Sequence, residues 1–348
     1  MDIVTHARLV ETASALVTRG KGVLAADESP KTLTARFQAL GIASTPESRS
    51  AYRELLFATE GVSRHISGVI LNEETLGQCA TDGRPFADVL LDAGLLPGIK
   101  VDRGLEPLAW APEEQVTEGL DGLRDRFAAY RDAGSRFAKW RALFRISPQT
   151  PSDYCIEVNA HALARYAALA QEAGLVPMVE AEVLLDGDHD LDACTDASER
   201  VLRELFAQIC RQRVELEAIL LKTNMVLSGK DATCRVGAQT VAERTIACLM
   251  ETVPAAVPGV LFLSGGQGDD EATENLNAIC LAGKRAGAPW QLSFSYARAL
   301  QGEPMRVWAG RRANVCKAQS ALVQRVRAVG AARQGEYAPD ASPQPALV

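Results

Sequence analysis

Short apolar runs alternate with longer amphipathic stretches along the whole chain. Eight of the runs have the length and the apolar, partly β-branched composition of buried strands. They cover residues 22–27, 66–72, 96–102, 136–142, 175–183, 218–226, 259–266 and 291–298. Helical periodicity fills the gaps, for example at 117–134, 151–174 and 196–215, and the first two of these segments end in glycine, as a C-terminal cap would. The N-terminal stretch 1–21 predicts one more amphipathic helix.

A strand followed by a helix, eight times over, favours a parallel α/β sheet, and eight units are the number that closes a (β/α)8, or TIM, barrel. A doubly wound open sheet is the alternative, but no G-x-G-x-x-G turn follows the first strand. We therefore expect a single barrel domain over residues 1–334. The Pro- and Ala-rich tail at 335–348 is expected to be mobile.

Polar side chains gather at or near the C-terminal ends of the predicted strands, the face where a (β/α)8 barrel builds its active site. They are Asp27, Asp102, Lys139, Arg141, Glu180, Glu182, Lys222, Ser264 and Arg298. Strand side chains alternate between two faces, so Lys139 shares a face with Arg141, and Glu180 shares one with Glu182. If these faces point inward, cations and carboxylates meet in one barrel mouth.

Lysine is rare in this chain, with 8 lysines against 29 arginines. Three of the lysines, Lys100, Lys139 and Lys222, stand in apolar strand-like runs. One such lysine is as often a snorkelling or edge residue, but three of them weaken that interpretation. Burial and neighbouring cations such as Lys139 and Arg141 favour a neutral amine. A neutral Lys222 can attack a ketone, and the resulting protonated imine stabilises a carbanion.

Carboxylates and a glycine-rich turn complete the candidate chemistry. Asp27, Glu180 and Glu182 each fit a structural ion pair when taken alone, but beside a neutral lysine they become candidate general acids and bases. The turn Ser-Gly-Gly at 264–266 can aim backbone N–H groups at an anion, and Arg298 can clamp a phosphate. Barrels often bind phosphate after strands seven and eight, although a lone Ser-Gly-Gly is equally a simple turn.

Composition argues against several other classes of protein. A net charge of −7 and a pI near 5.3 disfavour nucleic acid and anionic membranes as partners. Four scattered histidines and eight cysteines without a C-x-x-C pair predict neither a metal site nor a disulfide framework. The N-terminus lacks a signal-peptide pattern, and no apolar stretch is long enough to span a membrane. We therefore expect a cytoplasmic protein with reduced thiols.

Longer stretches of the sequence carry a family resemblance. They are GKGVLAADES at 20–29, GIKVD at 98–102, FAKWR at 137–141, VPMVEAEVLLDGDHDL at 176–191, LLKTNMV at 220–226, LFLSGGQ at 261–267 and LSFSYARALQ at 292–301. In this order they resemble the class I fructose-bisphosphate aldolases over about residues 14–339. The resemblance implies reversible Schiff-base cleavage of fructose 1,6-bisphosphate in glycolysis and gluconeogenesis. It also implies a metal-free (β/α)8 barrel without a cofactor, sugar phosphates as small-molecule partners, and a homotetramer.

Two other functions stay open at this point. One is a related Schiff-base lyase acting mainly on sedoheptulose 1,7-bisphosphate or fructose 1-phosphate. The other is a non-catalytic scaffold that keeps the fold and binds a protein partner. The complete set of Lys222, Lys139, Glu180 and Asp27 argues against the scaffold, because a decayed site would have lost some of it.

The resemblance also implies roles for single residues. Lys222 matches the Schiff-base lysine, Glu180 the glutamate that assists imine formation, and Asp27 the aspartate that accepts the C4 hydroxyl proton. Lys139 matches a lysine that positions substrate and stabilises charge, and Glu182 a glutamate beside the imine. Contacts with substrate or phosphate are implied for Ser29, Thr32, Arg36, Lys100, Arg141, Ser264, Gly265, Ser295 and Arg298.

The chain departs from the family pattern at some of these places. Ala297 and Lys31 replace glycines beside the two phosphates, and a methyl group at 297 is expected to alter the approach of the backbone to phosphate. The chain ends in PALV rather than in the tyrosine of the animal enzymes. From that ending we expect slower or differently assisted protonation of the enamine.

Overall fold

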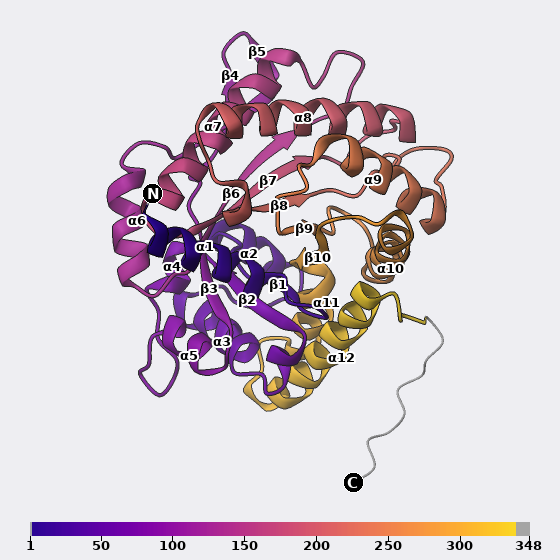
Figure 1. Ribbon diagram of the computed structural model, residues 1–348. Helices are drawn as coiled ribbons and strands as arrows, with labels where there is room; N and C mark the ends of the chain where they lie inside the picture. Colours follow the sequence, from indigo (N-terminus) through magenta and orange to yellow (C-terminus); the bar gives the residue numbers. More distant parts are fainter. Residues whose placement is uncertain (1, 339–348) are drawn as a thin grey trace.

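A closed barrel of parallel strands forms the centre of the computed structural model, which describes residues 2–338 (Figure 1). The barrel strands are β1 (Gly22–Ala25), β2 (Ile66–Leu71), β3 (Leu96–Lys100), β6 (Phe137–Phe144), β7 (Val176–Val183), β8 (Leu220–Thr223), β9 (Gly259–Phe262) and β10 (Gln291–Tyr296). Their order around the barrel is β1-β10-β9-β8-β7-β6-β3-β2. The (β/α)8 prediction is confirmed, and each predicted apolar run contains one barrel strand or most of it.

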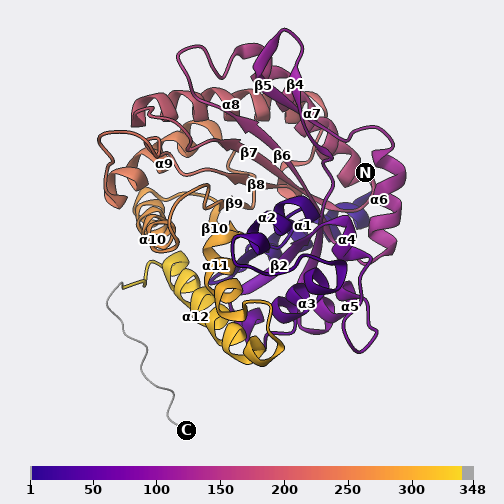
Figure 2. The same ribbon diagram turned by 180° about the vertical axis from the view of Figure 1, so that it is seen from behind.

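Helices surround the barrel in both views, and α1 lies across one of its ends (Figures 1 and 2). They are α1 (Ile3–Leu16), α2 (Pro30–Gln38), α3 (Pro46–Phe57), α4 (Glu73–Leu76), α5 (Phe86–Asp92), α6 (Leu123–Asp132), α7 (Asp153–Glu172), α8 (Leu191–Arg211), α9 (Ala238–Thr252), α10 (Asp269–Ala286), α11 (Arg298–Trp308) and α12 (Val315–Gln334). Short 3₁₀ turns lie at Val62–Arg64, Leu216–Ala218 and Arg312–Asn314. Side-chain caps fix several helix starts: Ser29, Ser152 and Asp190 each accept a hydrogen bond from a backbone N–H of the first turn.

The N-terminal helix α1 closes one end of the barrel. Its residues Leu9, Ala13 and Leu16 are buried in one apolar cluster with inward-facing strand residues. The strand members of this cluster are Val23, Ala25, Ile70, Phe137, Val176, Met178, Leu220 and Leu261. Burying a leucine side chain contributes about 1.5–3 kcal/mol, so α1 seals the barrel with a dry, stable floor.

Toward the C-terminal ends of the strands, the inward-facing side chains change from apolar to polar. Side chains two positions apart share a face, so the inward face of β7 reads Met178, Glu180, Glu182 from floor to mouth. On β8 the same step leads from Leu220 to Lys222. The C-terminal mouth of the barrel is therefore lined by charged groups that stand on a hydrophobic base.

The predicted helix at 117–134 is wrong in its first part. An antiparallel ribbon of β4 (Gly104–Leu108) and β5 (Ala111–Glu118) follows β3, and α6 begins only at residue 123. Gly119 and Gly122 have positive φ angles of 126° and 63°, which interrupt a helix at this point. In the other direction, the helix expected at 196–215 starts earlier, at residue 191.

The remaining expectations concern membrane-spanning helices and the C-terminal tail. Within residues 2–338, no helix combines the length and the apolar character that crossing a membrane would require. Tyr337 is partly buried, and its backbone N–H donates to Asn277 Oδ1 at 3.0 Å. The rest of the tail that we expected to be mobile, 339–348 with its PALV ending, lies outside the described residues.

Candidate active site

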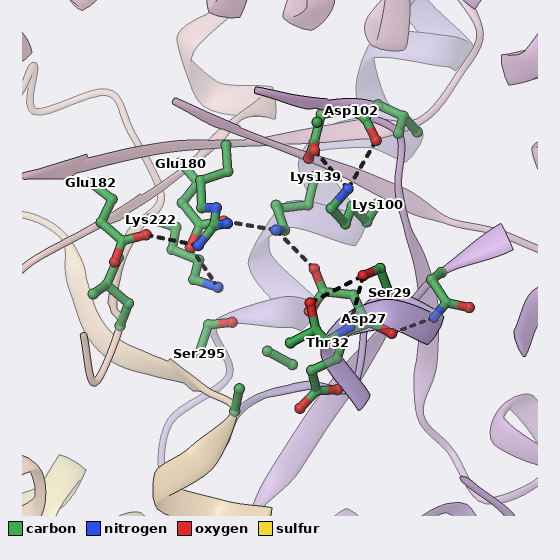
Figure 3. Close-up of a pocket in the computed structure, with 18 of the residues that line it drawn as sticks. Asp27, Ser29, Thr32, Lys100, Asp102, Lys139, Glu180, Glu182, Lys222 and Ser295 are labelled. Atoms are coloured by element: carbon green, nitrogen blue, oxygen red, sulfur yellow. Dashed lines mark hydrogen bonds and ion pairs between the residues drawn. The ribbon is translucent and has the colours of Figure 1, made fainter. Parts of the chain in front are cut away.

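A pocket of about 1030 Å³ opens at the C-terminal ends of the barrel strands (Figure 3). Almost all of the residues selected from the sequence line it: Asp27, Ser29, Thr32, Lys100, Lys139, Arg141, Glu180, Glu182, Lys222, Ser264, Gly265, Ser295 and Arg298. Arg36 does not line the pocket; its guanidinium pairs with the Glu28 carboxylate instead. The strand pairs at 139/141 and 180/182, whose orientation the sequence left open, point into the pocket.

Lys139 is the centre of a buried chain of charges. Its Nζ lies 2.8 Å from Asp27 Oδ2 and 2.9 Å from Glu180 Oε2. Dashed lines in Figure 3 mark such interactions among the pocket residues. The other oxygen of that glutamate, Oε1, lies 2.9 Å from Lys222 Nζ. Strand pairing places Lys222 directly beside Glu180. Carboxylates and lysine side chains therefore alternate from Asp27 to Lys222, with 9% or less of each residue exposed.

This alternation corrects one expectation. The sequence suggested that Lys139 and Arg141 adjoin Lys222 as neighbouring cations. Glu180 stands between Lys222 and Lys139 instead, because it projects inward from β7, the strand between β6 and β8. The immediate ionic neighbour of the Lys222 amine is an anion, so Glu180 is the group placed to exchange a proton with it.

The pKa values in the site follow from burial and from this order of charges. Burial opposes ionisation of Glu180, but the attraction of Lys139 and Lys222 outweighs it and lowers the pKa of Glu180 to about 2. The same competition lowers the pKa of Asp27 well below its ordinary value. Burial likewise disfavours the Lys139 ammonium, yet its two carboxylate neighbours raise its pKa. Asp27 is therefore a carboxylate and Lys139 a cation at neutral pH.

Glu182 differs from its neighbours on β7. Its Oε2 accepts a hydrogen bond of 3.2 Å from Arg141 Nη1. Burial raises the pKa of Glu182, and the Arg141 cation offsets this only in part, while the nearby Glu180 adds to it. Glu182 thus binds a proton more readily than an ordinary glutamate, whereas its neighbour Glu180 binds one less readily.

Two further pairs of polar residues lie at the rim, one at the end of β3 and one at the start of α2, which follows β1. Lys100 Nζ lies 2.6 Å from Asp102 Oδ1 and donates to the Asp102 carbonyl at 2.9 Å. At the start of α2, Ser29 Oγ accepts from the Thr32 N–H at 3.2 Å and lies 3.0 Å from Thr32 Oγ1. Asp102 was recognised in the sequence only as a strand-end residue. Its part in holding Lys100 follows from a spacing of two along one strand end.

The turns after β9 and β10 build another part of the rim. Gly265 has a φ of +32°, and a Cβ there would lie 2.5 Å from Leu263 Cδ1, so the tight turn requires glycine. Arg298 is the first residue of α11, and Ala297 immediately precedes it. Ala297 has a φ of −101°, so it lies outside the left-handed region that favours glycine.

The chain of buried charges gives stability a specific pH dependence. Because the pKa values of Asp27 and Glu180 are lowered on folding, their contribution is present above the unfolded pKa values, about 4, and is lost as the pH falls toward 2. We expect the free energy of unfolding, measured in urea, to decrease over this range. The variant Lys139→Gln should be less stable at pH 7, by about 3–5 kcal/mol, and should lose less on acidification. Parallel curves for the two proteins would contradict the assignment.

The chain is similar to known proteins over almost its whole length. Within residues 2–338 there is no group of three or more His, Cys, Asp or Glu residues arranged to hold a metal ion. A family model described as fructose-bisphosphate aldolase class-I matches residues 8–346. The probable fructose-bisphosphate aldolase class 1 of Xanthomonas campestris pv. campestris is 50% identical over 331 residues, 95% of this chain and 98% of that protein.

A plant relative and a solved structure are also aldolases similar to this chain. Fructose-bisphosphate aldolase 4, cytosolic, of Arabidopsis thaliana is 48% identical over 341 residues, 98% of this chain and 86% of that protein. The fructose-bisphosphate aldolase of Plasmodium falciparum, solved as a ternary complex with TRAP and a small-molecule inhibitor, is 44% identical. It superposes with a TM-score of 0.95 and a coverage of 97% of each chain.

Proposed function

Because this chain belongs to the family of class I fructose-bisphosphate aldolases, we propose that it catalyses the reversible cleavage of fructose 1,6-bisphosphate. The products are dihydroxyacetone phosphate and glyceraldehyde 3-phosphate. One observation carries the proposal: a buried lysine amine, Lys222 Nζ, lies 2.9 Å from a buried carboxylate inside a large pocket with cations at its rim. An amine and a proton acceptor in contact are what attack on a ketone needs.

Imine formation uses Lys222 and Glu180. The Lys222 amine attacks the C2 carbonyl carbon, its proton passes to Glu180, and Glu180 returns that proton to the former carbonyl oxygen, giving a neutral carbinolamine. Loss of the C2 hydroxyl as water needs a proton donor, and the elevated pKa of Glu182 makes it a suitable second acid beside Glu180. The product is a protonated imine, which withdraws electrons from the neighbouring carbon atoms.

Cleavage uses Asp27. Its carboxylate accepts the proton of the C4 hydroxyl, the C3–C4 bond breaks, and the bonding electrons move into the iminium to form an enamine. Lys139, 2.8 Å from the same carboxylate, keeps Asp27 ionised and balances the charge that develops there. After the aldehyde leaves, protonation of the enamine at C3 and hydrolysis of the imine release dihydroxyacetone phosphate.

Two groups of residues at the pocket rim suit the two phosphate groups of fructose 1,6-bisphosphate. The turn at Ser264 and Gly265, together with Arg298, follows the last two strands, where barrels commonly hold phosphate. Lys100 lines the same pocket at the end of β3, and Ser29 and Thr32 line it after β1. A phosphate that binds Lys100 must compete with Asp102, which holds this lysine in the free protein. Arg36 takes part only if it leaves Glu28.

Covalent trapping tests the proposal directly. Borohydride added with fructose 1,6-bisphosphate or dihydroxyacetone phosphate should attach the triose phosphate to Lys222, as peptide mass spectrometry would detect. Borohydride without the sugar phosphate should leave the mass of the protein unchanged. EDTA should not change the cleavage rate. An adduct on another lysine, or loss of activity in EDTA, would contradict the mechanism.

Location and assembly belong to the same proposal. We place the chain in the cytoplasm, as a homo-oligomer of four subunits. The names of the plant relatives, two of which are cytosolic isozymes, support the location. The tetramer rests on family resemblance alone, and light scattering coupled to size exclusion measures it.

A further inference from the structure

Glu28 stands between the proposed base, Asp27, and the cap of α2, Ser29, and its side chain joins three helices. The carboxylate pairs with Arg36 of α2, and its Oε2 lies 3.0 Å from Arg53 Nη2 of α3. Its Oε1 accepts a hydrogen bond of 3.0 Å from Gln301 Nε2 of α11. The Glu28 side chain is only 9% exposed, so these contacts are shielded from water.

The most constrained of these partners is Arg53. Only 1% of Arg53 is exposed, and the acceptors of its guanidinium are both atoms of Glu28: the carboxylate Oε2 and, at 3.4 Å, the main-chain carbonyl. Its Nε and Nη1 have no hydrogen-bond partner among the described residues. A buried cation needs a compensating anion, so Arg53 holds both the side chain and the backbone of Glu28 in place.

The backbone on either side of Asp27 is fixed by the same group of residues. Gln301 Nε2 donates to the Ala25 carbonyl at 2.6 Å as well as to Glu28. Asn72 Nδ2, from the end of β2, donates to the Glu28 carbonyl at 2.6 Å. Hydrogen bonds thus hold the backbone at Ala25, two residues before Asp27, and at Glu28, one residue after it. The Asp27 carboxylate itself pairs with Lys139.

We propose that Glu28 is a positioning residue for the cleavage step. It fixes the Asp27 carboxylate in the barrel mouth and ties it, through Arg36, to the helix that carries Ser29 and Thr32 at the rim. This inference rests on the proposed aldol cleavage. Imine formation at Lys222 and Glu180 does not depend on Glu28, because those residues stand on β7 and β8 and share no contact with it in the described structure.

The variant Glu28→Gln separates the two steps. Glutamine keeps the shape of the side chain but removes the charge, and its NH₂ group must face one of the two guanidinium groups. Borohydride trapping of dihydroxyacetone phosphate, which needs no cleavage, should proceed within about twofold of the wild-type rate. Single-turnover cleavage of fructose 1,6-bisphosphate should fall roughly 10- to 100-fold, as expected for a displaced catalytic group.

The matched control is Glu114→Gln. Glu114 is also a buried carboxylate, 6% exposed, but it accepts from the Ser152 N–H at the start of α7, away from Asp27. This control should lose stability without changing either step. If Glu28→Gln does not fold, Arg53→Lys is measured in the same way and should show the same separation. Lysine keeps the charge but lacks the Nη2 group that donates to the Glu28 carboxylate and to its main-chain carbonyl.

A double variant shows whether Glu28 acts through Asp27. The double variant Glu28→Gln/Asp27→Asn should cleave no more slowly than Asp27→Asn alone. Once the Asp27 carboxylate has been removed, losing the residue that positions it has no further effect on the cleavage rate. Additive losses, an equal loss of trapping and cleavage, or unchanged cleavage would each overturn the inference. Failure of the wild-type protein to cleave fructose 1,6-bisphosphate would instead refute the proposed function itself.

Discussion

Lys222→Arg should abolish covalent trapping of substrate and lower the cleavage rate by roughly four orders of magnitude or more, the scale on which enzymes lose a covalent nucleophile. Arginine keeps the positive charge beside Glu180, so the loss does not come from an unpaired carboxylate. A guanidinium cannot be deprotonated in a protein and therefore cannot attack the ketone. Steady-state cleavage assays and mass spectrometry of the borohydride-treated protein measure the two effects.

Lys230→Arg is the matched control for this substitution. Lys230 pairs with Asp186 on the surface, with half of its side chain exposed, and it does not line the pocket. The control should trap and cleave substrate as the wild type does. Normal turnover by Lys222→Arg, with a thermal midpoint close to that of the wild type, would show that no imine at this position is required.

Asp27→Asn should leave imine formation intact and slow cleavage by roughly 10² to 10⁴, the contribution of a positioned general base. The asparagine oxygen can still accept a hydrogen bond from Lys139, so the substitution preserves the shape of the site. It cannot take the proton of the C4 hydroxyl. The protein should therefore accumulate a covalent adduct of the uncleaved bisphosphate, which borohydride reduction and mass spectrometry would identify by its larger mass.

The control for this variant is Asp153→Asn. Asp153 is an exposed residue at the start of α7 that pairs with Arg200, and it does not line the pocket. Its loss should change neither step. If Asp27→Asn instead trapped only the triose phosphate and cleaved at the wild-type rate, the proton acceptor would be a different group. Glu182 would then be the next candidate, because it is buried in the same pocket.

Taken together, the two substitutions dissect the reaction. Lys222→Arg removes both the adduct and the cleavage, whereas Asp27→Asn removes only the cleavage. Glu28→Gln is expected to resemble Asp27→Asn in a weaker form, because it displaces the base rather than deleting it. The position of each residue in the chain of buried charges, from Asp27 through Lys139 and Glu180 to Lys222, accounts for this order of effects.

The amino-acid sequence by itself determined the architecture and most of the site. Short apolar runs with turns between them predict strands wherever they occur, and the period of two along a strand places Glu180 and Glu182 on one face. Polar residues at the ends of such runs, such as Lys222, then meet at one barrel mouth, because parallel strands all end on the same side. The β4–β5 ribbon was not predicted, because its partly exposed strands lack the continuous apolar run of a barrel strand.

Only the tertiary structure decided which charges pair. Glu180 separates Lys222 from Lys139 because barrel closure sets three strands side by side in a fixed register. Arg36, selected as a substrate contact, does not line the pocket and pairs with Glu28, which does. Gln301 reaches that same carboxylate from 273 positions further along the chain. Local patterns follow from the geometry of each strand or helix. Partners from distant segments are chosen by the packing of those elements against one another, and no local pattern records it.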